Sequence, residues 1–121
     1  MWKIQKKIKE MMEARGWDKT APADQAKSIM IEGAELLEHF QWKNFTVTEI
    51  KKDEEKYTAV QSEVADIMIY AIDLATNLGV DVEKVVLDKL KVVEKKYPAG
   101  IIKRDKAQYW QLKKQYRKDH A

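Results

Sequence analysis

Two pairs of carboxylates, each three residues apart, interrupt stretches that are otherwise rich in apolar residues. Glu32 and Glu35 lie in IEGAELLEHFQW, and Glu63 and Asp66 lie in VQSEVADIMIY. On a helix, residues three apart lie roughly 60° apart around the axis and about one turn apart along it, so each pair shares a face. Two like charges placed in this way repel each other unless a cation or water neutralises them. The spacing therefore indicates either a cation site or two solvated helix faces.

The four carboxylates would offer oxygen ligands only. Such hard ligands suit magnesium or manganese, and calcium less specifically. Four carboxylates carry more charge than one dication, so the set is compatible with more than one metal ion together with an anionic substrate. The alternative is that each pair merely sits on a solvated face, because either short motif alone is weak evidence for a metal. Further along the same central stretch, Asp73 is expected to pair with a lysine or to serve an interface.

The elements that must position these pairs are helices. Only four glycines and two prolines occur, and no alternating strand pattern is present. Thr46 and Glu49 form a capping-box pattern, and Gly79 is a helix stop signal. The pattern predicts an all-α, four-helix-bundle-like fold. Its expected helices span residues 2 to about 15–16, 20–22 to about 40–42, a short segment after 46, 53–78, 82–97 and 106–117.

Two of these helices carry apolar faces that need partners. The helix over 53–78 is apolar on nearly every side from Val60 onward, which is typical of a helix buried in a bundle or at a subunit boundary. The helix over 82–97 has a stripe that we expect to be core. Its members are Val82, Val85, Val86, Leu90, Val93 and Tyr97.

Length, charge and cysteine content restrict the class of protein. The 121 residues fit one domain over 1–121, with a basic tail at about 99–121. Residues 83–121 hold 12 Lys and Arg against 5 Asp and Glu, whereas residues 1–82 hold 11 against 15. The absence of cysteine excludes disulfides and thiolate metal sites. With no continuous apolar run for a signal peptide or a membrane span, we expect a cytoplasmic protein with no membrane partner.

Several motifs occur in a specific order. They are Glu32-x-x-Glu35, 27 intervening residues, Glu63-x-x-Asp66, RGW at 15–17, FQW at 40–42, DIMIY at 66–70, GVD at 79–81, Lys89 and KYP at 96–98. With this set, roughly residues 15–98 of the chain resemble the MazG-like, all-α nucleoside triphosphate pyrophosphohydrolases, and among them the dCTP pyrophosphatase branch.

The resemblance implies a MazG-type fold completed by dimer packing or by a tetramer made of two dimers. It also implies hydrolysis of a (d)NTP between the α and β phosphates to (d)NMP and pyrophosphate, as in a dCTP or modified-nucleotide house-cleaning enzyme. Magnesium, with manganese as a possible substitute, would be the cofactor. The implied metal ligands are Glu32, Glu35, Glu63 and Asp66, and Glu38 joins them as a catalytic candidate. The implied substrate-binding residues are Trp42, Lys89, Lys96 and Tyr97.

The dCTP branch usually carries an asparagine where this chain has Val93, so the resemblance leaves base and sugar preference open. A function of another class, binding without catalysis, also stays open. A non-catalytic helical module could bind nucleic acid or another partner through the basic tail, which interleaves Tyr109, Trp110 and Tyr116 with Lys and Arg. If the protein is a pyrophosphohydrolase, its partners are the nucleotide and its own second copy, and nucleic acid is not expected.

Overall fold

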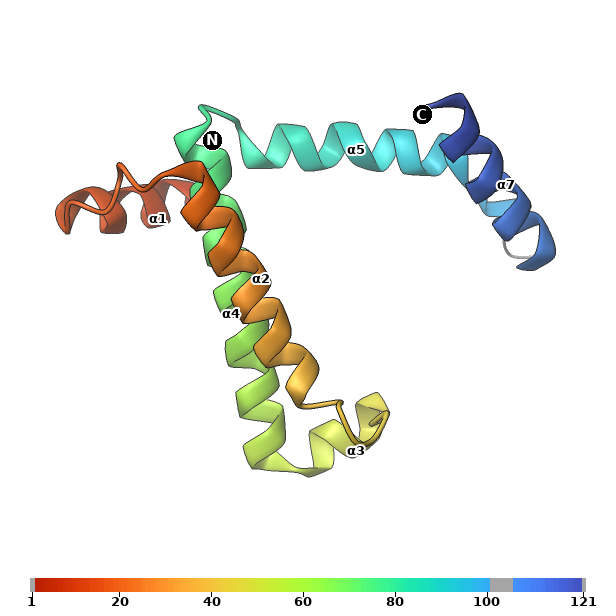
Figure 1. Ribbon diagram of the computed structural model, residues 1–121, viewed down its shortest axis with the longest axis horizontal. Helices are drawn as coiled ribbons and strands as arrows, with labels where there is room; N and C mark the ends of the chain where they lie inside the picture. Colours follow the sequence, from red (N-terminus) through yellow and green to blue (C-terminus); the bar gives the residue numbers. More distant parts are fainter. Residues whose placement is uncertain (1, 101–105, 121) are drawn as a thin grey trace. The chain divides into compact units, whose positions relative to one another are not determined.

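The structure, a computed structural model, describes residues 2–100 and 106–120, with side chains described through 100 and from 110 onward. Every regular element in these residues is a helix, which confirms the all-α prediction (Figure 1). The chain forms two compact units, Met1–Val82 and Glu83–Ala121. A single domain over 1–121 stays a prediction. The helices are α1 (Lys3–Ala14), α2 (Pro22–Glu38), α3 (Val47–Lys52), α4 (Glu54–Asn77), α5 (Val82–Lys96) and α7 (Lys106–Asp119).

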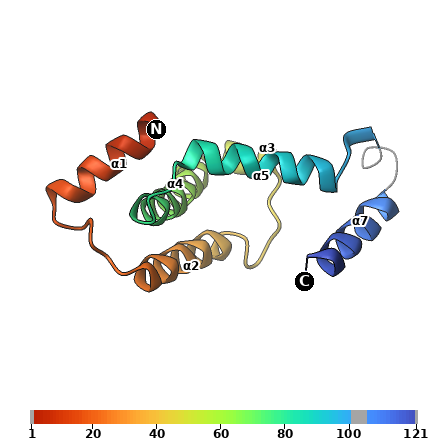
Figure 2. The same cartoon turned by 90° about the horizontal axis from the view of Figure 1, so that it is seen from above.

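Helices α2 and α4 run antiparallel and side by side, as both views show (Figures 1 and 2). Pro22 occupies the first turn of α2, where its missing N–H and fixed φ are tolerated. The prediction that this helix continues to about 40–42 was wrong, because α2 ends at Glu38. The N–H groups of His39 and Phe40 donate to carbonyls only three residues back, at 3.2 and 2.9 Å. This tighter turn ends the α-helical hydrogen-bond pattern.

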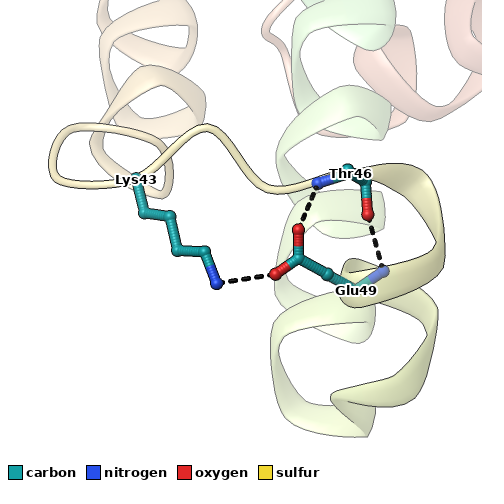
Figure 3. Close-up of polar contacts among 3 residues, drawn as sticks. All are labelled: Lys43, Thr46 and Glu49. Carbon is teal, nitrogen blue, oxygen red and sulfur yellow. Dashed lines mark hydrogen bonds and ion pairs between the residues drawn. The ribbon is translucent and has the colours of Figure 1, made fainter.

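The segment between α2 and α3 is fixed by the capping box that the sequence predicts (Figure 3). The N–H of Glu49 donates to Thr46 Oγ1 at 3.2 Å, and the N–H of Thr46 donates to Glu49 Oε1 at 3.1 Å. Lys43 Nζ donates to the other Glu49 oxygen at 2.6 Å. The hydrogen bond from Lys43, together with the bonds from Thr46, lowers the pKa of Glu49. These contacts hold the chain that follows the α2 terminus close to the start of α3.

Helix α1 packs against the far end of α4 through a small core that includes Ile8, Met12, Ile72 and Val82. Beside it, the fully buried amide of Gln5 closes the turn between α4 and α5. Its Nε2 donates to the carbonyl of Val80 at 2.7 Å, and its Oε1 accepts from the N–H of Val82 at 2.9 Å.

The turn itself confirms the predicted stop at Gly79, whose φ of 73° lies in the left-handed region that glycine adopts without strain.

Most of the predicted core stripe on α5 is not buried in the single chain. Val82 is buried, but Val85, Val86, Leu90 and Val93 are between 38% and 51% exposed. The described part of α7, the other helix of this unit, is mostly polar and offers little apolar surface to cover them. Among the described residues, no helix combines the length and apolar character needed to cross a membrane.

Candidate metal centre and adjoining cavity

Three of the predicted carboxylates converge where α2 and α4 pack together. Each of Glu32 on α2 and Glu63 and Asp66 on α4 offers an oxygen, and these oxygens lie within 4.8 Å of one another. All three side chains are half-buried. The antiparallel pairing of α2 with α4 brings together groups that are far apart in sequence. The described residues therefore contain an acidic cluster that faces the seam between two helices.

The electrostatics of this cluster are unfavourable without a cation. Desolvation, followed by the neighbouring Glu35 carboxyl, raises the pKa of Glu32 to about 7. Desolvation and the same Glu35 neighbour also raise the pKa of Glu63. Glu32 Oε2 and Glu63 Oε2 are buried, and neither has a hydrogen-bond partner among the described residues. Buried carboxylate oxygens of this kind must be protonated or must be neutralised by a positive charge.

The donor set fits a hard divalent cation such as magnesium. All ligand atoms are carboxylate oxygens, and two of these carboxylate groups hold an oxygen that has no partner in the part of the chain that the structure describes. Glu35 lies outside the group of three, yet it is close enough to interact with both Glu32 and Glu63. Glu38, the last residue of α2, is exposed and also lies outside the group. Metal ligation by the four carboxylates and a catalytic role for Glu38 stay predictions.

A cavity of about 400 Å³ adjoins the cluster, since Asp66 forms part of its wall. Its size lies in the range of small-molecule sites. The apolar part of the wall consists of Met11, Met12, Trp17 and Ile69. The polar part consists of Thr20, Gln25, Ser28, Asp66, Tyr70 and Asp73. Of these residues only Asp66 was a predicted site residue, although Trp17, Ile69 and Tyr70 belong to the motifs RGW and DIMIY. For two other lining residues the sequence did hold a signal. Gln25 precedes Glu32 by seven residues and Asp73 follows Asp66 by seven, and this spacing places each of them on the same helix face as a carboxylate of the cluster.

Gln25 and Asp73 form a buried pair in this wall. Gln25 is 1% exposed and Asp73 is 4% exposed. Gln25 Nε2 donates to Asp73 Oδ2 at 2.8 Å. The expectation of a lysine partner for Asp73 was therefore wrong: burial beside α2 leaves Asp73 facing an amide. The other atom of that amide, Gln25 Oε1, is buried and accepts no hydrogen bond from the described residues.

None of the predicted substrate-binding residues is among the residues that line this cavity. Trp42 is 90% exposed on the α2–α3 segment and does not line the cavity beside Asp66. Lys89, Lys96 and Tyr97 belong to the second unit. Lys89 is exposed on α5, whereas the Lys96 ammonium lies over the rings of Tyr97 and Tyr116, at 4.9 and 4.1 Å from their centroids. Substrate contacts by these four residues stay predictions.

Part of the basic tail, residues 101–105, lies outside the described residues, and the side chain of Tyr109 is not described either. Within α7, Trp110 is 58% exposed with the Lys113 ammonium over its ring, and Tyr116 stacks on His120 at 3.8 Å between centroids. These contacts are internal to the helix and identify no ligand.

Comparisons with known proteins add independent information. The MazG-like family matches residues 27–112. Human dCTP pyrophosphatase 1 is 28% identical over 109 residues, and the bovine protein of the same name is 29% identical over 113 residues. Each alignment covers 85% of this chain, and the chain spans only 62% of the length of these relatives.

A crystal structure of a pyrophosphatase from Archaeoglobus fulgidus superimposes with a TM-score of 0.66 and 34% sequence identity. The match covers 78% of this chain and 89% of that one. It confirms the predicted fold at the level of the protomer.

Proposed function

Since the chain belongs to the MazG-like family, we propose that it is a magnesium-dependent nucleoside triphosphate pyrophosphohydrolase. The proposed reaction cleaves a (d)NTP between its α and β phosphates and releases (d)NMP and pyrophosphate. The observation that carries this proposal is the convergence of Glu32, Glu63 and Asp66, two of which hold buried oxygens without partners among the described residues. Such a cluster suits a cation that must in turn hold a polyphosphate.

In this proposal Glu32, Glu63 and Asp66 hold the metal, and Glu35 completes the set from the exposed side of α2. The bound dication would offset phosphate charge, orient the attacking water and lower the pKa of that water. Because the site is half-buried, its carboxylates are held in place by helix packing, which favours positioning as a source of rate. Glu35 and Glu38 are the candidates for accepting the water proton, and manganese could substitute for magnesium.

The cavity beside Asp66 is the proposed place for the nucleoside. Its wall offers the faces of Trp17 and the two methionines to a base, and hydroxyl and amide groups to polar edges. The human and bovine relatives are named dCTP pyrophosphatase 1, and these names support dCTP as a substrate. A house-cleaning role on modified nucleotides is part of the proposal. Trp42 would help to enclose a base only if substrate or a second copy of the chain covers it, because it is 90% exposed. Binding of the phosphates or the sugar by Lys89, Lys96 and Tyr97 is also part of the proposal.

Self-association is part of the proposal. An apolar groove of about 410 Å³ runs between α3 and α4. Four of the large apolar residues that line it are exposed, namely Val47, Tyr57, Val64 and Met68. A second copy of the chain packed against this face would cover it and give the predicted dimer, or a tetramer made of two dimers. A cytoplasmic location, where nucleotides and magnesium are available, completes the proposal.

The decisive experiment is to incubate the protein with magnesium and a panel of canonical and modified NTPs and dNTPs, and to identify the products by chromatography. We expect monophosphate and pyrophosphate from a few substrates, and loss of both products when EDTA is added. Diphosphate and inorganic phosphate would instead show cleavage at another bond. No turnover by folded protein at saturating magnesium would contradict the proposal.

The same preparation distinguishes the alternative of a nucleic-acid-binding module. Binding of single-stranded DNA or RNA that needs no magnesium and weakens steeply with added salt would favour that reading. A pyrophosphohydrolase is expected to show neither property.

A further inference from the structure

We infer that the cavity beside Asp66 selects nucleotides whose base carries a positive charge, which alkylation of a ring nitrogen produces in 3-methylcytosine and 1-methyladenine. Asp73 and Trp17 are the specificity-determining residues in this inference. It rests on the proposed function and names a substrate class for the same site, namely nucleoside triphosphates with an alkylated, cationic base.

The wall of this cavity carries negative charge at two places. It includes the carboxylates of Asp66 and Asp73, and none of the described residues that line it is a lysine, an arginine or a histidine. Asp73 follows Asp66 by seven residues on α4, so it lies two helical turns, or about 10 Å, further along the helix. The proposed metal takes up the charge of Asp66, which leaves the charge of Asp73 in the wall. A cleft lined by one sign of charge concentrates ligands of the opposite sign.

The charge of Asp73 is not cancelled by a cation of the protein. Asp73 is 4% exposed, and its one partner among the described residues is the neutral amide of Gln25, whose Nε2 donates at 2.8 Å. A hydrogen bond from an amide orients a carboxylate, but buried charges are normally paired with the opposite charge. Asp73 also borders a smaller pocket that contains Lys9, whose ammonium lies 3.9 Å from Glu13 and is neutralised there. The charge of Asp73 is therefore available to a cationic ligand.

An aromatic ring lines the same cavity. Trp17 is held by the turn that ends α1, because its N–H donates to the carbonyl of Met12 at 2.9 Å and Gly16 supplies the left-handed residue, with a φ of 69°. The hydroxyl of Thr20 donates to the carbonyl of Trp17 at 3.0 Å. Indole is the side chain that attracts a cation over its face most strongly. The turn therefore adds a second cation-attracting group to the wall that contains Asp73.

The two groups favour the same ligands. Methylation of the ring nitrogen at position 3 of cytosine, or at position 1 of adenine, leaves the base positively charged at neutral pH. Attraction to the carboxylate of Asp73 and to the indole of Trp17 then strengthens, and neither attraction depends on one hydrogen-bonding edge of the base. The inferred selectivity therefore follows charge, and it applies to cytosine and adenine nucleotides alike.

The test compares kcat/KM at neutral pH within two pairs of isomeric nucleotides. In each pair the methyl group lies either on the ring nitrogen, which makes the base cationic, or on the exocyclic amino nitrogen, which leaves it neutral. The first pair is 3-methyl-dCTP and its amino-methylated isomer, and the second is 1-methyl-dATP and its amino-methylated isomer. We expect the unaltered protein to prefer the cationic isomer of each pair by about tenfold.

Variants of the wall assign this preference to its source. Asp73→Asn removes the charge and keeps an oxygen that can accept from Gln25, and we expect it to reduce the preference to about threefold or less. The same change in an exposed residue outside the cavity wall, Asp88→Asn, is the matched control and should leave the preference unchanged. Because Trp17 is 55% exposed, Trp17→Leu keeps the test valid if Asp73→Asn folds poorly, and it should also reduce the preference.

The outcomes separate the inference from the proposed function. If nucleotides are hydrolysed but the two isomers of each pair have equal kcat/KM, the inference is overturned and the reaction stands. A preference that persists in well-folded Asp73→Asn, or in Trp17→Leu, also overturns it. If no nucleotide is hydrolysed at all, the proposed function fails and the inference fails with it.

Discussion

Glu32 of α2 and Glu63 of α4 bring carboxylate oxygens within 4.8 Å of each other, and each of these residues keeps one buried oxygen without a partner among the described residues. Two acids in this arrangement oppose each other until a proton or a cation intervenes. The same arrangement therefore costs stability in the metal-free protein and supplies the binding site in the metal-bound one.

Removing one of these charges should separate activity from folding. We expect Glu63→Gln and Asp66→Asn each to lower kcat/KM for the best substrate by about 100-fold or more, because a metal ligand is lost. Neither should lower the melting temperature of the metal-free protein, since like-charge repulsion is relieved. Steady-state kinetics and thermal melts measure the two effects. Glu55→Gln, an exposed position on α4, is the control and should change neither. Full activity in both site variants would remove the cluster from the mechanism.

Stability without metal should depend on pH in a defined direction. The pKa of Glu32 is about 7 in the folded protein against an ordinary value of 4.5, and the pKa of Glu63 is also raised. A group with a raised folded pKa binds its proton more tightly when folded, so its contribution is fully present below pH 4.5. That contribution is lost as the pH rises through about 7.

The difference in melting temperature between Glu32→Gln and the unaltered protein isolates this effect in EDTA. As the pH rises from 4.5 to 7.5, the melting temperature of Glu32→Gln should rise relative to that of the unaltered protein, because Gln mimics the protonated acid at every pH. With saturating magnesium at pH 7.5, the unaltered protein should have the higher melting temperature, since the bound cation then neutralises the carboxylates in place of protons. A difference that does not change with pH would contradict the raised pKa of Glu32.

Gln5 should matter for folding rather than for substrate choice. Gln5→Leu leaves the carbonyl of Val80 and the N–H of Val82 without the partners that the amide provides. We expect the free energy of unfolding to fall by about 2–4 kcal/mol. Urea unfolding followed by circular dichroism measures this loss, with Gln111→Leu as an exposed control expected to stay within about 0.5 kcal/mol. An unchanged midpoint would show that the turn after α4 is held by other contacts.

Two glycine substitutions should change the free energy of unfolding in opposite directions. Nothing lies within 4 Å of a Cβ built at either Gly79 or Gly33, so sterics with neighbours do not decide the outcome. Gly79 has a φ of 73°, and Gly79→Ala should cost about 1 kcal/mol through backbone strain. Gly33 lies inside α2 with an ordinary helical φ, and Gly33→Ala should stabilise by about 0.5–1 kcal/mol. Denaturant titrations at one protein concentration should find Gly33→Ala more stable and Gly79→Ala less stable than the unaltered protein. The reverse order of stabilities would contradict this prediction.

The apolar groove between α3 and α4 should control self-association. Met68 lines it and is 49% exposed, so Met68→Glu places a charge on the face that a second copy would bury. We expect this variant to shift toward the monomer in size-exclusion chromatography with light scattering. Ser62→Glu adds the same charge to an exposed position of α4 that does not line the groove, and it should leave the oligomer intact. Equal behaviour of the two variants would place the interface elsewhere.

Several features of this protein follow from local sequence alone. Helix-forming composition, the capping box of Thr46 with Glu49 and the stop at Gly79 depend on residues within one or two turns of each other. The two carboxylate pairs were visible for the same reason, because their three-residue spacing is a property of one helix. The end of α2 was misplaced by a few residues, since helix termini depend on weak competing hydrogen bonds.

Only the tertiary structure decided which of these residues meet. The antiparallel packing of α2 and α4 selected Glu32, Glu63 and Asp66 as a cluster and left Glu35 at its edge. The same packing paired Asp73 with Gln25 instead of a lysine. The cavity formed only where α1 and the segment that contains Trp17 meet α2 and α4. Contacts between helices depend on the rotation and register of both surfaces at once, and neither helix encodes these quantities by itself. The sequence thus determined the chemical groups that are available, while packing determined their partners and their loss of water.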